Sequence, residues 1–381
     1  MRPFVPAALL SLSLLAGCGV PVTGSHLSTN RAPVQNFFQG LSLASDGTLH
    51  KEASDLFTSD EFDAIDTAHT GRLTKAQLQH FFETQQDPGV NLGDMPISPG
   101  ELAIIGISGG AIAGYLTFVG TKISSEVMHP GKSRPVAATG GTPVSLTSDG
   151  LTLAATYQAA ATATDSAVVL CHPIGASKEA MVDYAKVLSQ YNVLSFDFRN
   201  HGGSQGGVTT GGLLESHDVA AAVAYLKGQG NKHVGALGVG MGAVAALDAA
   251  SAGAGLDGVF SDSAYTALTD DMTRRAKAHH FPLSSFAGQA ATVILGLRTH
   301  TSPNHGDAIN NVGNLSRTIT FFTQMSSDPN LAGNSAQVLH DASTLPTFMW
   351  LASGKGASTL QLDPTDYAKN AQTFFQRAFN Q

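Results

Sequence analysis

From about residue 141 to the end of the chain, short apolar segments alternate with segments of helical character. "SAVVLCHPIG" at 166–175, "YNVLSFDFRNHGG" at 191–203 and "LDGVFSDSAYTAL" at 256–268 each begin as a buried strand and end in a loop. Before them, "PVSLTSDGLTLAATY" predicts a hairpin that turns at Asp149-Gly150. Strands that alternate with helices predict an α/β fold class, with a mostly parallel sheet covered by helices on both faces.

The segment "GALGVGMGAVAAL" at 235–247 predicts a strand, a glycine-dense turn and a helix. Two kinds of site use such a turn. One is the nucleophile elbow G-x-S-x-G, whose middle position is Gly240 in this chain. The other is the dinucleotide loop G-x-G-x-x-A, which Gly238, Gly240 and Ala243 also fit, with Asp262 near the spacing of a ribose-binding acid. The elbow is the favoured interpretation, because a dinucleotide loop usually opens its domain and this turn follows two earlier strand–helix units.

Three further motifs in the same order and spacing resemble the α/β-hydrolase superfamily over residues 141–381. "HPIG" from His172 resembles the loop after the third strand, and "DFRNHGGS" from Asp197 resembles the family's D-x-R-G-x-G-x-S turn. Gly212, Glu215 and Asp218 match a frequent helix start, and the resemblance extends to a cap at 268–312. The resemblance implies an oxyanion hole formed by the backbone N–H groups of Ile174 and Met241.

The same resemblance places the three catalytic positions at Gly240, Asp328 and Ala357. Serine attack needs a hydroxyl and a base that accepts its proton, and neither glycine nor alanine supplies one. We therefore expect no intact catalytic set: a pseudoenzyme with an α/β-hydrolase fold that acts as a binding or scaffold module for an unknown small molecule or protein. The alternative is an active hydrolase of esters, thioesters or peptides that uses unorthodox residues.

The N-terminal residues 1–17 predict a lipoprotein signal peptide, since Arg2 precedes an apolar stretch that ends in "LAGC". This ending resembles the lipobox of bacterial lipoproteins, which implies acylation of Cys18. The alternative is an ordinary signal peptide that contains a cysteine. Lipidation predicts a membrane-anchored protein of the cell envelope, at the outer membrane or on the periplasmic face of the inner membrane.

Residues 36–86, between linkers at 18–35 and 87–100, contain two weak matches to the EF-hand calcium loop. The later match begins at Asp66, and Asp46 lies within the earlier one. Alanine, threonine and glutamine replace most of the expected ligands. Calcium requires six to eight oxygen ligands with a bidentate carboxylate at the last position. We therefore expect vestigial loops without metal, or simply a small helical domain.

Residues 101–123 predict an apolar, glycine-rich helix, followed by a linker at 124–140. Its uncharged part, 102–120, is long enough to cross a bilayer, while five glycines lower both its helix propensity and its apolarity. A membrane span and a buried or peripheral helix both remain open at this point.

The remaining residues favour structural roles. The net charge is −8 without a basic block, so no nucleic-acid partner is expected. Cys171 is interpreted as a core thiol, and Ser261 and Ser263 as hydrogen-bonding groups. The histidines at 279, 280, 300 and 305 lack the neighbouring ligands of a zinc site. We expect neither a metal nor an organic cofactor.

Overall fold

The computed structural model describes residues 48–50, 66, 70–74, 77, 99–131, 140–328, 331, 334–354 and 358–380. The chain divides into two units, Met1–Leu116 and Thr117–Gln381, with the boundary inside helix α5 (Pro99–Met128). The expectations for Cys18, Asp46 and Ala357 lie outside the described residues.

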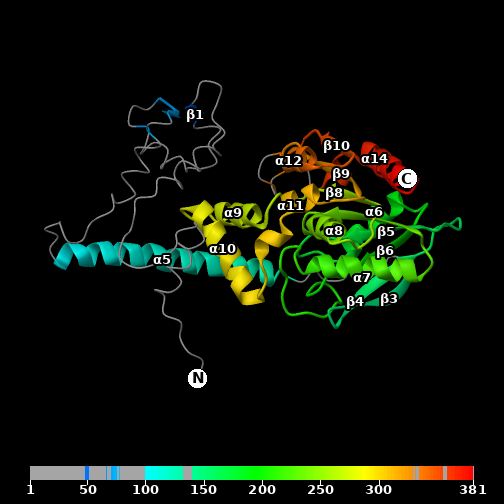
Figure 1. Cartoon of the computed structure of the whole chain (residues 1–381), viewed down its shortest axis with the longest axis horizontal. Coiled ribbons are helices and arrows are strands. Elements are labelled where there is room, and N and C mark those ends of the chain that lie inside the picture. Colours follow the sequence, from blue (N-terminus) through cyan, green and yellow to red (C-terminus); the bar gives the residue numbers. More distant parts are fainter. Residues whose placement is uncertain are drawn as a thin grey trace. The chain divides into compact units, whose positions relative to one another are not determined.

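The second unit is built on an eight-stranded sheet with the order β10-β9-β8-β7-β5-β6-β4-β3 (Figure 1). Six strands are parallel, and β3 and β4 pair antiparallel at one edge. The predicted hairpin turn at Asp149-Gly150 is confirmed, with φ of 49° and 78°. The strands are β3 (Thr142–Ser148), β4 (Leu151–Gln158), β5 (Ser166–Cys171), β6 (Asn192–Phe196), β7 (His233–Val239), β8 (Gly258–Asp262), β9 (Ile319–Met325) and β10 (Thr347–Ala352).

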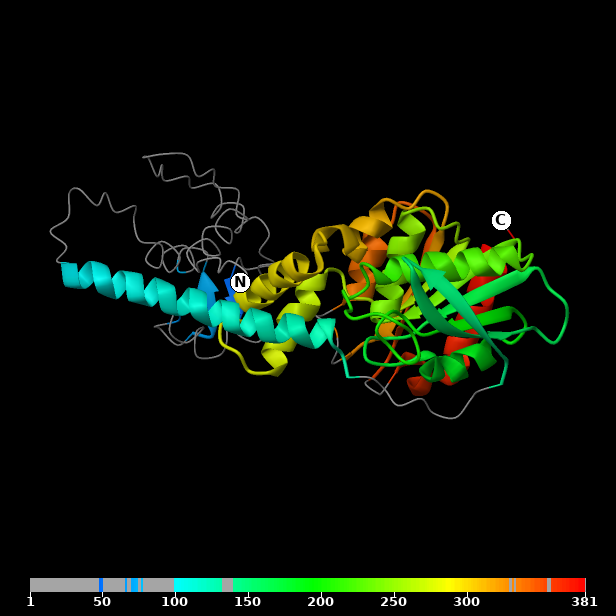
Figure 2. The same cartoon turned by 90° about the horizontal axis from the view of Figure 1, so that it is seen from below.

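Helices cover both faces of this sheet, as the alternating sequence pattern predicts (Figure 2). One face packs against α7 (Glu215–Gly228), α8 (Met241–Ser251) and α12 (Ser335–Ala342), with α11 (Ala308–Gly313) against α8. The other face packs against α6 (Val182–Val187) and α14 (Pro364–Ala378). The shorter helices are η2 (Lys178–Met181), η3 (Pro303–Gly306) and α13 (Thr359–Leu362).

The core on the α6–α14 side is rich in aromatic rings. Phe260 and Phe321, on the neighbouring strands β8 and β9, stack with their centroids 4.5 Å apart, and Phe374 of α14 contacts both edge-on. Each buried aromatic ring removes a large apolar area from water, so this cluster fixes α14 on the sheet. It thereby fixes the strand ends that border the site.

Two helices follow β8 and precede β9 in the chain, within the predicted cap. They are α9 (Leu268–Ala278) and α10 (Ser284–Thr299), which pack on each other. The C-terminal part of α5 also packs here: a Cβ on Gly120 would lie 2.9 Å from the side chain of Ile294. Glu126 of α5 pairs with His279, so at least one predicted cap histidine has a structural partner.

Residues 102–120 lie within α5. In the part of the chain that the structure describes, no helix is both long and apolar enough to cross a bilayer.

The first unit contains a two-stranded antiparallel sheet of β1 (Thr48–His50) and β2 (Arg72–Thr74). The pairing brings Leu49 opposite Leu73, and Leu73 is fully buried. The carboxylate of Asp66 accepts hydrogen bonds from the Thr70 hydroxyl at 3.0 Å and from the Gly71 N–H at 2.6 Å. The Asp66 side chain therefore holds its own loop closed.

Candidate active site

Gly240 forms the sharp turn between β7 and α8, with φ 54° and ψ −118°. A positive φ of this size strains any residue except glycine, and it is the backbone conformation of a nucleophile elbow. A Cβ added to Gly240 would meet only the Cβ of Pro173, at 3.6 Å. The elbow thus has open space where an attacking side chain would stand.

The two flanking glycines serve a different purpose, which is close packing of the backbone. A Cβ on Gly238 would lie 2.4 Å from the Gly242 carbonyl oxygen, and one on Gly242 would lie 2.2 Å from the Cys171 carbonyl oxygen. Neither position can hold a larger residue without a backbone shift. The glycine pattern that suggested a dinucleotide loop is explained by this packing of strand, turn and helix.

The loop after β5 faces the elbow and is held by two buried histidines. The His172 Nε2 accepts a hydrogen bond from the Phe198 N–H at 3.1 Å, and the His201 Nε2 accepts one from the Gly175 N–H at 3.1 Å. Burial lowers the pKa of His172 to about 3 and also lowers the pKa of His201. Both rings are therefore neutral, and they fix the loop rather than transfer protons.

Asp197, which follows β6, also holds the segment after β5 in place. Its carboxylate is fully buried and accepts from the Lys178 N–H at 2.7 Å, the Lys178 Nζ at 2.9 Å and the Gly203 N–H at 2.9 Å. Nearby, Arg199 forms a buried pair with Asp218, at 2.7 Å from its Nη2. The residues of the D-x-R motif and of the G-x-x-E-x-x-D helix start thus belong to the framework of the site.

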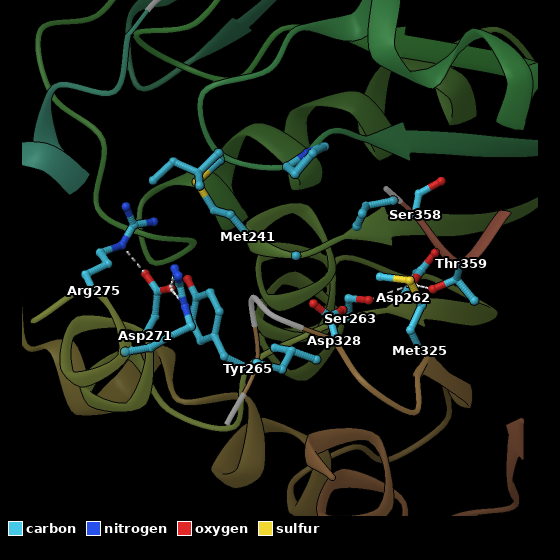
Figure 3. Close-up of a pocket in the computed structure, with 16 residues that line it drawn as sticks. Met241, Asp262, Ser263, Tyr265, Asp271, Arg275, Met325, Asp328, Ser358 and Thr359 are labelled. Atoms are coloured by element: carbon cyan, nitrogen blue, oxygen red, sulfur yellow. Dashed lines mark hydrogen bonds and ion pairs between the residues drawn. The ribbon is translucent and has the colours of Figure 1, made fainter. Parts of the chain in front are cut away.

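These loops and the elbow enclose a cavity of about 410 Å³ at the carboxyl ends of the parallel strands (Figure 3). The predicted positions Ile174, Gly240, Met241 and Asp328 all line it. In the described residues, no acceptor is found for the backbone N–H of Ile174 or Met241. The structure therefore brings together the two expected oxyanion donors, the elbow and the acid position.

The third catalytic position, Ala357, lies outside the described residues, which end at Gly354 and resume at Ser358. Among the described residues that line the cavity there is no histidine. The nearest upstream histidine in the sequence, His340, lies on α12 and contacts Asp341 at 3.0 Å. No described imidazole is placed to accept a proton at the elbow.

Asp262 is a carboxyl of the cavity wall that sequence analysis connected only with the dinucleotide alternative. It ends β8 beside the elbow, where its carbonyl oxygen accepts from the Gly240 N–H at 2.8 Å. Its Oδ1 accepts from the Ser263 and Thr359 hydroxyls at 2.9 and 2.8 Å, and burial raises the pKa of Asp262 to about 6. The hydrogen-bonding role expected for Ser263 is therefore confirmed, whereas the same expectation for Ser261 is wrong, because its buried hydroxyl has no partner among the described residues.

The buried surroundings of Asp262 include groups without a hydrogen-bond partner. Among the described residues its Oδ2 has none, and neither do the hydroxyls of Ser261 and Tyr367. Burial raises the pKa of Tyr367 as well, and the Asp262 charge raises it further, so that phenol stays neutral. Cys171, as expected, is a buried thiol whose pKa is raised by burial.

The opposite wall of the cavity carries a charge cluster on α9 that sequence analysis missed. Asp271 is nearly buried and contacts Arg274 at 2.6 Å and Arg275 at 2.7 Å (Figure 3). An acid three and four residues before two arginines predicts an ion pair on one helix. Only the tertiary structure shows that these three side chains line the same cavity as the elbow.

No group of three or more His, Cys, Asp or Glu side chains suited to a metal ion occurs within the described residues.

Comparison with known proteins agrees with this geometry. Residues 168–368 match the model of the alpha/beta hydrolase family, and the chain therefore belongs to that family. It is 25% identical over 226 residues to the uncharacterized protein YqkD of Bacillus subtilis, covering 57% of this chain and 73% of that protein. The dinucleotide alternative for the elbow is accordingly set aside.

Solved structures show the same fold at lower identity. An esterase of Pyrococcus furiosus is 21% identical, with a TM-score of 0.54, covering 65% of this chain and 98% of its own. The alpha/beta hydrolase GrgF from Penicillium is 18% identical, with a TM-score of 0.51, covering 64% of this chain and all of its own.

Proposed function

We propose that this member of the alpha/beta hydrolase family is a binding protein without hydrolytic activity. The observation that carries the proposal is Gly240 at the tip of a complete elbow. The backbone has the turn that presents a nucleophile, and the position has no side chain to present. The absence of a histidine among the described lining residues and the alanine at position 357 support it.

The chemistry of the described groups does not replace the missing parts. Nucleophilic catalysis needs a nucleophile and a base within hydrogen-bonding reach of each other. The Ile174 and Met241 N–H groups stabilise negative charge on a bound oxygen, which is a binding feature when no attack occurs. The cavity therefore retains recognition without the reacting pair.

One observation favours the second candidate, an unorthodox hydrolase. The Ser263 hydroxyl lines the cavity and donates to Asp262, and Ser263 has a strained φ of 56°. Backbone strain of this kind often occurs at functional sites. If the chain hydrolyses esters, Ser263 is its nucleophile.

Labelling with a fluorophosphonate probe and hydrolysis of p-nitrophenyl butyrate separate the two candidates. We expect neither labelling nor turnover for the wild-type chain. Labelling that maps to Ser263 would establish the hydrolase instead. In the double variant Gly240→Ser with Ala357→His we expect labelling at position 240, because both missing groups return to the family's positions. The matched control, Gly240→Ala with Ala357→His, should stay unlabelled.

We further propose that the chain is anchored in the cell envelope through acylated Cys18 and carries metal-free loops in its first unit. The "LAGC" ending supports the anchor. The Leu49–Leu73 register and the internal bonds of Asp66 support loops that pair without calcium. Labelled palmitate incorporated equally into wild type and Cys18→Ala would exclude the anchor.

A further inference from the structure

A second cavity, of about 400 Å³, adjoins the first at the elbow. The two share three lining residues, Pro173, Val239 and Ser358. Their linings differ in character. The first contains Asp271, Arg274, Arg275, Asp262 and Asp328, whereas the second is mainly apolar, with Asp183 as its charged residue. The two adjoining cavities therefore form a polar side and an apolar side, with the elbow near the boundary.

The walls of the second cavity suit a hydrocarbon chain. Met181 and Leu360 are buried and Val187 is half-buried, while Ala180 and Gln361 are exposed at its rim. A cavity of a few hundred Å³ with apolar walls is the usual setting for the apolar part of a small ligand. Each methylene transferred into it from water increases the affinity of the ligand.

The elbow itself favours a group with two oxygens. In a serine enzyme, one oxygen of a bound acyl group points into the oxyanion hole and the serine hydroxyl occupies the space beside it. In this chain that space is open, because a Cβ at Gly240 would come no closer than 3.6 Å to Pro173. A carboxylate can therefore place one oxygen at the Ile174 and Met241 N–H groups and its second oxygen over Gly240.

Two elements bring positive charge to the lining of this cavity. The N-terminus of α8 begins at Met241 and carries the positive end of the helix dipole. On α9, Arg274 and Arg275 both pair with the carboxylate of Asp271 among the described residues, so these three side chains together carry one net positive charge. Arginine retains several N–H donors after one ion pair, so the wall can still attract an anion.

Two carboxyls of the lining, Asp262 and Asp328, oppose an anion, and Asp262 makes the binding depend on pH. Asp328 lines the cavity, and Asp262 has its pKa raised to about 6 by burial. The other titratable groups that interact with Asp262 are Tyr184 and Tyr367, whose raised pKa values keep them neutral. As the pH falls through about 6, Asp262 becomes neutral and its repulsion of an anion disappears.

We propose that the two adjoining cavities together bind an aliphatic carboxylic acid, with the carboxylate over Gly240 and the chain in the apolar cavity beside Met181 and Leu360. The proposal rests on the absence of hydrolysis proposed above, and it names the class of ligand. The acid, rather than its ester, is the ligand because the ester has only one oxygen suited to the oxyanion donors.

The test is calorimetric titration of the full chain with octanoate, butyrate, octanol and octylamine. We expect octanoate to bind at least about tenfold more tightly than octanol, since charge-assisted hydrogen bonds are the stronger ones. The affinity for octanoate should also exceed the affinity for butyrate by about tenfold or more, because octanoate has four more methylenes. Between pH 8 and pH 5.5 the octanoate affinity should rise about threefold or more. Octanol or octylamine binding as tightly as octanoate would overturn the proposal.

Two pairs of variants locate the two parts of the ligand. Ala180→Trp fills the rim of the apolar cavity and should weaken the binding of octanoate more than that of butyrate. The control is Ala252→Trp, at an exposed position that lines neither cavity, which should change the binding of neither acid. Gly240→Ala should weaken the binding of both acids. Gly253→Ala, at another glycine with a positive φ (83°), should weaken the binding of neither. Ala180→Trp binding octanoate as wild type would overturn the placement of the chain.

The outcome also separates the two proposals. A folded chain that is not labelled by fluorophosphonate and does not bind octanoate contradicts the ligand alone. A labelled chain contradicts the proposed function, whatever the titration shows.

Discussion

The loop after β5 and the elbow after β7 border the same cavity but are held by different forces. The loop depends on buried polar groups, with His172, His201 and Asp197 accepting hydrogen bonds from backbone N–H groups. The elbow depends on close backbone packing at Gly238 and Gly242. This difference means that the catalytic side chain can be lost while the shape of the cavity is kept. Removing a framework group leaves buried donors unpaired, whereas a glycine at position 240 leaves the turn intact.

The largest effect is expected where the framework is broken. Asp197→Ala removes the acceptor of three donors, two of them from Lys178 and one from Gly203. Loss of one partner from a buried charge network typically costs about 3–5 kcal/mol of unfolding free energy. Urea unfolding should show a loss of this size. Asp165→Ala, at an exposed ion pair with Lys232, should leave the urea unfolding curve essentially unchanged.

A slightly smaller effect is expected for Asp262, the last residue of β8, whose carbonyl oxygen accepts a hydrogen bond from the elbow. Its pKa is raised to about 6, so the folded chain holds this proton more tightly than the unfolded chain does. The resulting stabilisation is complete below pH 4 and is lost as the pH rises through 6. Relative to Asp262→Asn, the wild type should therefore lose about 2.5 kcal/mol of stability between pH 4 and pH 7. A stability difference that stays constant with pH would contradict this.

The smallest of the three effects tests whether the elbow is relaxed by its glycine. Gly240→Ser introduces a side chain at a φ of 54°, which costs about 1–3 kcal/mol. There is room for the serine, so the loss reflects backbone strain alone. Thermal and urea melts should show this loss, and the single variant should remain inactive on esters. The control is Gly207→Ser, where φ is not positive and nothing lies within 4 Å. Equal losses in both variants would remove the distinction between the elbow and an ordinary surface turn.

Sequence by itself determined the α/β fold, the hairpin at Asp149-Gly150 and the elbow at Gly240, because each depends on local patterns. Strand and helix periodicity, turn glycines and motif spacing are properties of neighbouring residues in the chain. The resemblance to the hydrolase family places Ile174, Met241 and Asp328 at the site, and the structure brings them into one cavity.

Only the tertiary structure decided which groups surround the elbow. Arg274 and Arg275 come from a helix inserted between β8 and β9, and the apolar cavity is formed by segments more than 170 residues apart, from Ala180 to Pro364. Asp262 acquires its raised pKa from burial, which no local pattern encodes. Such contacts depend on how distant elements pack, and packing is a property of the whole core rather than of any segment.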